Sequence, residues 1–137
     1  DEAVEARANS TIAALFASEG ESVFRRLESE VCAAAAKETG QIISTGGGIV
    51  KNSDNVRLLR QNGVLIFIDR APNLLAMGDA RPLSKNAQAV QKLYTERLPL
   101  YRAAADVTVE NSGTLAAVAA KIKEAFDEIT RFERTES

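Results

Sequence analysis

The sequence predicts an α/β protein in which helices cover a parallel sheet. Segments with the period of amphipathic helices alternate with short apolar runs. Residues 64–69 (Val-Leu-Ile-Phe-Ile-Asp) contain no polar side chain before the last position, which is typical of a strand covered on both faces. No internal repeat or linker interrupts the 137 residues, so we expect one domain over residues 1–130.

The N-terminal part is expected to be helical. Asp1 can cap a helix over residues 2–8, and Ser10 can cap a second helix that ends at Gly20. Apolar residues then recur at helical spacing over residues 21–39, and the glycine that follows is a suitable stop. These patterns predict two short helices and one long amphipathic helix.

The middle of the chain is expected to continue as strand, helix, strand and loop. Residues 41–44 (Gln-Ile-Ile-Ser) are apolar and β-branched and predict a buried strand, and residues 53–62 predict a helix. The strand at residues 64–69 follows. Two prolines, Pro72 and Pro82, then interrupt regular structure and predict a mobile loop.

The C-terminal part is expected to hold two helices and the last strand. A helix begins near residues 87–94, and Pro99 is expected to kink or end it. Residues 106–110 (Asp-Val-Thr-Val-Glu) predict a third strand, and Thr114 can cap a final helix. Residues 131–137 are expected to form a frayed tail.

Composition excludes several classes of function. The formal charge of −2 and pI of about 5.3 give no positive field for nucleic acid or an anionic membrane. The sequence has no histidine, which removes histidine-based triads and the common zinc sites. The single cysteine, Cys32, lies in an apolar helical pattern and is expected to be a packed core thiol. With no apolar run of membrane-spanning length and no signal peptide, we expect a cytoplasmic protein.

Three consecutive glycines mark a candidate site after the first predicted strand. Gly46, Gly47 and Gly48 follow Thr45, and side-chain-free backbone there can approach a ligand with its N–H groups. A tight turn without any ligand is the alternative reading, and the triplet alone leaves both open.

Arginines near these segments indicate anion binding. Guanidinium groups bind carboxylates and phosphates through a fork of donors. The candidates are Arg25, Arg26, Arg81 and Arg97. Taken singly, each also fits a surface ion pair, such as Arg25 with Glu28 or Arg97 with Glu96.

The order of these segments resembles the shikimate kinase family. Phe-Arg-Arg-Leu-Glu at 24–28, the glycine triplet, Arg-Pro-Leu at 81–83 and Glu-Arg-Leu-Pro-Leu-Tyr at 96–101 occur in the family's order, and the resemblance runs from Asp1 to about Phe126. It implies a fold of the P-loop nucleoside-monophosphate-kinase type. The implied activity is phosphorylation of the 3-hydroxyl of shikimate with ATP and Mg²⁺.

The resemblance also assigns roles to residues. Asp1 matches the aspartate that orients shikimate hydroxyls, including the attacking one, and Arg25 and Arg97 match the pair that clamps the shikimate carboxylate. Backbone N–H groups of the segment of Gly46, Gly47 and Gly48 are expected to hold substrate hydroxyls.

On the nucleotide side, Arg81 matches the catalytic lid arginine that swings over the phosphates, in a lid at about residues 71–87. Asn111 falls where the family's adenine-contacting loop follows the last strand.

Two departures from the family pattern qualify this assignment. The sequence shows no Gly-x-x-Gly-x-Gly-Lys-Ser/Thr phosphate loop and neither of the first two strands. We therefore expect the sequence as given to be incomplete for catalysis, and the metal ligands stay unknown. In the family's strand order, 2-3-1-4-5, the first strand lies between those expected here at 41–44 and 64–69. We therefore expect that a further segment of the parent protein or another chain fills the gap. The lid also lacks the family's adenine-stacking arginine, which puts adenine packing in doubt.

Shikimate is thus the expected small-molecule substrate of a monomeric enzyme that binds neither nucleic acid nor membrane. Two alternatives stay open: a non-catalytic shikimate-binding remnant, and a gluconate-kinase-like enzyme of the same fold. Arg81 argues against the first, and the presence of both Arg25 and Arg97 argues against the second.

Overall fold

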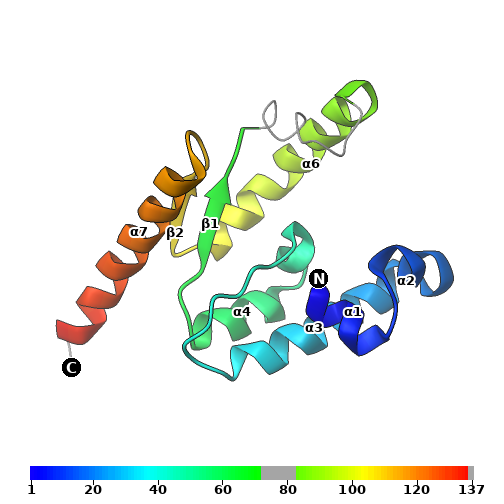
Figure 1. Cartoon of the computed structure of the whole chain (residues 1–137), viewed down its shortest axis with the longest axis horizontal. Coiled ribbons are helices and arrows are strands. Elements are labelled where there is room, and N and C mark those ends of the chain that lie inside the picture. The colour runs from blue at the N-terminus through cyan, green and yellow to red at the C-terminus, as the bar shows by residue number, and fades with distance from the viewer. Residues whose placement is uncertain (72–82, 136–137) are drawn as a thin grey trace. The chain divides into compact units, whose positions relative to one another are not determined.

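The computed structural model describes residues 1–71 and 83–135, and within these ranges the chain forms two compact units (Figure 1). One unit is Asp1–Gly63 and the other is Val64–Ser137. The expected domain over residues 1–130 stays a prediction, and most of the expected lid, including Arg81, lies outside the described residues.

The first unit is helical. Its elements are α1 (Glu2–Ala8), α2 (Ile12–Glu19), α3 (Glu21–Ala36), the 3₁₀-helix η1 (Gly47–Lys51) and α4 (Ser53–Gln61). Val4, Leu15 and Phe24 form its buried apolar cluster, one residue from each of the first three helices. Phe16 adds an aromatic contact to Phe24, with ring centroids 4.9 Å apart. Helices α1 and α2 therefore pack on one face of α3.

The helix boundaries largely follow the sequence, with local corrections. Asp1 occupies the N-cap position of α1, but its side chain makes no capping hydrogen bond. Thr11 caps α2 instead of Ser10, because the Thr11 hydroxyl accepts from Ala14 N at 3.1 Å. Gly20 ends α2 as expected, with a φ of 84° that favours glycine.

Helix α3 ends at Ala36, three residues earlier than expected. The side chain of Asn62, just beyond α4, donates to the carbonyls of Ala36 and Glu38 at 3.2 and 3.3 Å. These bonds satisfy carbonyls at the helix end and fix the chain as it leaves α3.

The prediction of a buried strand at residues 41–44 is wrong for this structure. The segment forms no strand, and Ile42 is fully exposed while Ile43 is 41% exposed. An extended segment becomes a strand only when its backbone groups pair with a neighbour. Among the described residues, the only strand pair is β1 with β2, and neither strand pairs with this segment.

The second unit contains a two-stranded parallel sheet between long helices. Its elements are β1 (Ile66–Asp69), α6 (Leu83–Ala104), β2 (Val107–Glu110) and α7 (Leu115–Thr135). Ile66 pairs with Val107, which confirms the expected parallel arrangement. Both strands begin later than expected. Just before them, the Asp106 carboxylate accepts from Leu65 N and the Asp106 N–H donates to Leu65 O, each at 2.7 Å.

The two C-terminal helices are longer than expected. Helix α6 continues through Pro99, and Tyr101 beyond the proline stacks on Phe67 of β1 with ring centroids 4.9 Å apart. That contact stabilises the last turn despite the backbone hydrogen bond lost at the proline. Helix α7 runs to Thr135, so residues 131–135 are helical where we expected a tail, and the other two residues lie outside the description.

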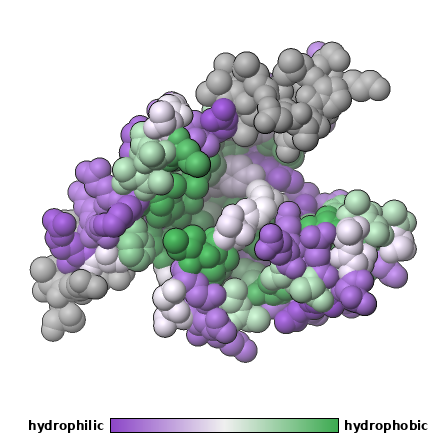
Figure 2. All heavy atoms as spheres, in the orientation of Figure 1, coloured by the Kyte–Doolittle hydropathy of each residue, from purple (hydrophilic) through white to green (hydrophobic). Residues whose placement is uncertain are grey.

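Apolar side chains gather over the sheet and the adjoining face of α7, whereas the outer face of α7 is hydrophilic (Figure 2). The large apolar residues of this unit that are most exposed include Ile68 and Leu115, at 47% and 87%. No helix in the described part of the chain is both long and apolar enough to cross a membrane.

Candidate functional site

The glycine triplet starts the 3₁₀-helix η1 and is not the end of a strand. Gly46 is extended, with φ −72° and ψ 157°, and its carbonyl accepts from Ile49 N at 3.3 Å. Gly48 is buried together with Ile49 and Val50. The segment is therefore a tight turn whose glycines leave the backbone uncovered by side chains.

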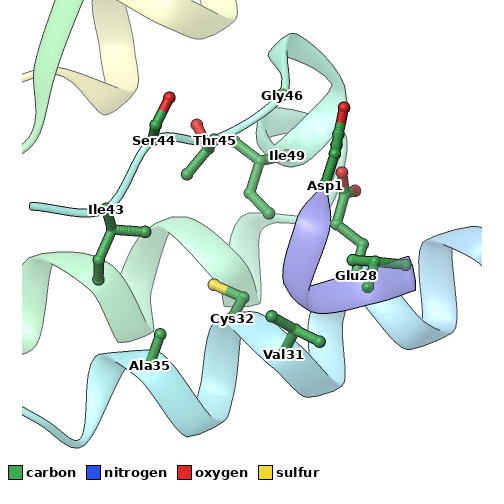
Figure 3. Close-up of a pocket in the computed structure, with 11 residues that line it drawn as sticks. Asp1, Glu28, Val31, Cys32, Ala35, Ile43, Ser44, Thr45, Gly46 and Ile49 are labelled. Atoms are coloured by element: carbon green, nitrogen blue, oxygen red, sulfur yellow. The ribbon is translucent and has the colours of Figure 1, made fainter. Parts of the chain in front are cut away.

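A small hollow lies beside this turn within the first unit (Figure 3). Its volume is about 60 Å³, enough for a few water molecules. Its lining residues are Asp1, Val4, Glu28, Val31, Cys32, Ala35, Ile43, Ser44, Thr45, Gly46 and Ile49. Figure 3 shows the side chains of Asp1 and Glu28 together at the Gly46 end, while apolar side chains, the Cys32 thiol and the hydroxyl side chains of Ser44 and Thr45 line the rest.

Two carboxylates approach Gly46. A Cβ atom placed on Gly46 would lie 3.8 Å from Glu28 Oε2 and 3.9 Å from Asp1 Oδ1. Asp1 comes from the start of α1, whereas Glu28 comes from the middle of α3. The fold thus brings the first residue of the chain and a helical acid to one point of the glycine turn.

Arg25 reaches the same turn from α3. Its Nη1 donates to Glu28 Oε1 at 3.0 Å, and its Nε donates to Glu21 Oε1 at 3.4 Å. The guanidinium lies against Gly48, close enough that a Cβ there would be 2.6 Å from Cζ. The Arg25–Glu28 pair considered from the sequence therefore exists, but Glu28 is only 7% exposed, so it is not a solvated surface pair.

A second cation joins this cluster from the end of η1. Lys51 Nζ lies 3.3 Å from the same Glu21 oxygen that pairs with Arg25. The hydrogen bond and charge of Lys51, followed by those of Arg25, lower the pKa of the Glu21 carboxyl below its ordinary 4.5. Glu21 therefore stays ionised and links the start of α3 to the glycine turn.

Cys32 is a packed thiol, as expected. It is 6% exposed, and its Sγ lies 3.9 Å from the carbonyl oxygen of Asn55. Burial, and secondarily the charge of Glu28, raise the pKa of this thiol above its ordinary 9.0. A thiol held neutral in this way is a poor nucleophile.

The remaining predicted site residues belong to the second unit. Arg97 lies on α6, and its Nε is buried without a hydrogen-bond partner among the described residues. Asn111 directly follows β2, where its N–H donates to Asp69 O at 2.6 Å and its carbonyl accepts from Arg70 at 3.2 Å. Asn111 therefore takes part in a backbone junction at the ends of the two strands.

The structure thus brings Asp1 and Arg25 together with the glycine turn, and it adds residues that sequence reasoning did not select. Glu28, Glu21 and Lys51 complete the charged cluster. The pairing of Glu21, Arg25 and Glu28 could have been predicted from the sequence. These residues are spaced i, i+4 and i+7 along one helix and therefore share a face. Nothing in the sequence indicated that Lys51 would meet them.

No group of three or more Asp, Glu, Cys or His residues that could hold a metal ion occurs in the described part of the chain. Asp1 and Glu28 are near one another, but Glu28 is already paired with Arg25. These residues alone do not form a magnesium site.

Comparison with known proteins identifies the family. The shikimate kinase family matches residues 1–127. The chain belongs to the shikimate kinase family. Shikimate kinases from Clostridium botulinum strain Alaska E43 and from Clostridium beijerinckii are both 40% identical to it, over 124 and 129 residues. These alignments cover 88% and 90% of this chain and 74% and 75% of the relatives.

Solved shikimate kinases share the fold. The enzyme from Acinetobacter baumannii in complex with shikimate superposes with a TM-score of 0.83 at 27% identity, covering 96% of this chain and 76% of that one. The enzyme from Aquifex aeolicus also gives 0.83, at 28% identity, covering 95% and 80%. These similarities confirm the fold expected from the sequence resemblance, the P-loop nucleoside-monophosphate-kinase type.

Proposed function

We propose that this protein transfers the γ-phosphoryl group of ATP to the 3-hydroxyl of shikimate. The observation that carries the proposal is the cluster at the glycine turn, where Asp1 and the Arg25–Glu28 pair meet bare backbone. Family membership supports the same reaction. A carboxylate and a guanidinium are the groups needed to orient a hydroxyl and bind a substrate carboxylate.

On the substrate side, we assign the shikimate carboxylate to Arg25 and Arg97. Arg25 spends Nε and one Nη1 hydrogen on glutamates and keeps other N–H donors for a ligand. The Nε of Arg97 is buried and has no hydrogen-bond partner among the described residues. A buried donor of this kind normally has an acceptor, which the substrate carboxylate would supply. The N–H groups of the turn of Gly46, Gly47 and Gly48 are assigned to substrate hydroxyls.

Asp1 is assigned to the attacking hydroxyl. Its carboxylate accepts a hydrogen bond from that hydroxyl, which directs an oxygen lone pair toward the phosphorus. Phosphoryl transfer needs mainly alignment and charge neutralisation, so a single orienting carboxylate is sufficient for this half of the reaction.

On the nucleotide side, we assign Arg81 to the transferring phosphoryl group and Asn111 to the vicinity of adenine. ATP is proposed to arrive as its magnesium complex, with most metal ligands supplied by phosphates and water, and no residue described here is assigned to the metal. We further propose that the enzyme works in the cytoplasm as a monomer, which size-exclusion chromatography tests.

The proposal is tested by measuring binding and turnover separately. Calorimetric titration with shikimate and a coupled assay of ADP release, both carried out on the full-length parent protein, should respond to shikimate and not to gluconate. Arg25→Ala should weaken shikimate binding roughly 10- to 100-fold, the worth of a charge-assisted contact. Arg26→Ala is the matched control, since Arg26 is exposed and forms no ion pair with the described residues.

The outcomes separate the alternatives. In the full-length parent protein, binding of shikimate without ADP release would favour a non-catalytic binder, and ADP release driven by gluconate would reject shikimate as the substrate. Equal losses in Arg25→Ala and Arg26→Ala would reject the assignment of Arg25.

A further inference from the structure

The guanidinium of Arg25 occupies the space where Gly48 would carry a side chain. An ideal Cβ on Gly48 would lie 2.6 Å from both Cζ and Nη2 of Arg25, and closer still to Nη1. Because Nη1, Cζ and Nη2 of Arg25 all lie this close to the ideal Cβ position, the planar guanidinium covers the Cα of Gly48. Real Cβ atoms essentially never approach other heavy atoms this closely.

Backbone conformation does not explain a glycine at this position. Among the residues that the structure describes, the glycines with positive φ are Gly20, Gly40 and Gly113, and Gly48 is not one of them. An L-amino acid can therefore adopt the backbone angles of Gly48. The requirement for glycine comes from the space that the guanidinium fills.

From this geometry we infer that Gly48 is a positioning residue, which sets the place of the Arg25 guanidinium by leaving its own side-chain position empty. The inference rests on the proposed role of Arg25 in binding shikimate. It gives Gly48 a function separate from that of its backbone N–H, and it distinguishes the glycines within the triplet. At Gly46 a Cβ would make only ordinary contacts of 3.8 and 3.9 Å, and those contacts are with Glu28 and Asp1.

A methyl group on Gly48 should move the guanidinium and spare the fold. The obstructed atoms are the end of a flexible side chain that is 29% exposed, so Arg25 can rotate toward solvent. Rotation would break the 3.0 Å bond from Nη1 to Glu28 and the 3.4 Å bond from Nε to Glu21, which fix the present orientation. The arginine would remain charged but misplaced.

The test is a double-mutant cycle with Gly48→Ala, Arg25→Ala and the combined variant. Gly48→Ala should weaken shikimate binding about tenfold, because misplacing a binding group by about 1 Å is costly. The KM for ATP should change little, and the melting temperature should fall no more than it does in Arg25→Ala, which loses the same bond to Glu28. In the Arg25→Ala background, Gly48→Ala should have no further effect on shikimate binding.

The shikimate affinities of the three variants separate the inference about Gly48 from the proposed role of Arg25. Unchanged shikimate affinity in Gly48→Ala, or a loss that adds fully to that of Arg25→Ala, overturns the inference while leaving the role of Arg25 intact. Unchanged affinity in Arg25→Ala overturns the proposed substrate contact and the inference with it. If Gly48→Ala lowers the melting temperature more than Arg25→Ala does, Gly48 is a packing position and the inference is also rejected.

Discussion

At the scale of single residues, Glu28 connects the site to the fold. It is buried, pairs with Arg25 Nη1 at 3.0 Å, and approaches Gly46 with its other oxygen. Removing Glu28 leaves the Arg25 guanidinium, which is 29% exposed, without its 3.0 Å partner. Glu28→Ala should therefore lower the free energy of unfolding by about 1–3 kcal/mol in urea titrations.

Glu28→Gln keeps the shape and removes the charge, so it should raise the KM for shikimate several-fold and affect stability less than alanine does. Glu30→Ala is the control, because Glu30 makes only an exposed 3.4 Å pair with Arg7, worth less than about 1 kcal/mol. Equal destabilisation by Glu28→Ala and Glu30→Ala would contradict the buried pair.

Cys32 gives a prediction about pH. Its pKa is raised in the folded protein by burial and by Glu28, so the folded state holds its proton at a pH where the unfolded chain releases it. The favourable contribution of the neutral thiol is complete below the ordinary value of 9.0 and is lost as the pH rises through the raised folded value.

Stability measured by urea titration should therefore fall above about pH 9 in the wild type, and this part of the fall should be absent in Cys32→Ala. The native thiol should also react slowly with iodoacetamide and become reactive in urea. Rapid alkylation of the native protein would show that the thiol is accessible.

At the scale of elements, the start of α7 depends on one side chain. The Thr114 hydroxyl accepts from Ala117 N at 3.1 Å, and the Thr114 carbonyl accepts from Val118 N at 3.1 Å. Thr114→Ala should cost about 1 kcal/mol of stability, the usual worth of an N-cap. Thr130→Ala, which removes only bonds from a hydroxyl to the Phe126 and Asp127 carbonyls within the same helix, should change stability by less than about 0.5 kcal/mol. Similar costs in thermal melts would reject the capping role.

Local signals predicted most elements because those elements depend on local chemistry. The Thr114 cap, the Gly20 stop and the apolar period of α3 act within a few residues of sequence, and all three are confirmed. The segment at residues 41–44 has strand composition, but a strand also needs a partner, which composition does not show. Helix α6 passed Pro99 because Phe67, distant in sequence, stacks on Tyr101.

The candidate site divides in the same way. Asp1, Arg25 and the glycine turn were predicted from a family pattern, and the structure brings them together in one unit. Lys51 and Glu28 were missed as site residues because their part depends on how η1 folds against α3. Sequence spacing along one helix indicates shared faces, whereas contacts between elements require the tertiary structure.

At the scale of the whole molecule, the net charge of the cluster at the glycine turn limits what it can bind. Arg25 and Lys51 are matched by Glu21 and Glu28, and Asp1 adds a further negative charge. The cluster in the first unit therefore has no excess of positive charge with which to hold an anion. A carboxylate substrate needs another cation, and Arg97 is the one that the family resemblance assigns to it.

Arg97→Ala should therefore raise the KM for shikimate at least about tenfold, with little change in the KM for ATP, because one charge-assisted contact to the substrate is lost. Arg81→Ala should instead mainly lower kcat, since its proposed contact forms with the transferring phosphoryl group. Arg102→Ala is the control, because Arg102 is an exposed arginine on the same helix as Arg97. Steady-state kinetics with each substrate varied in turn would measure all three, and equal effects of Arg97→Ala on both KM values would reject the assignment of Arg97 to shikimate.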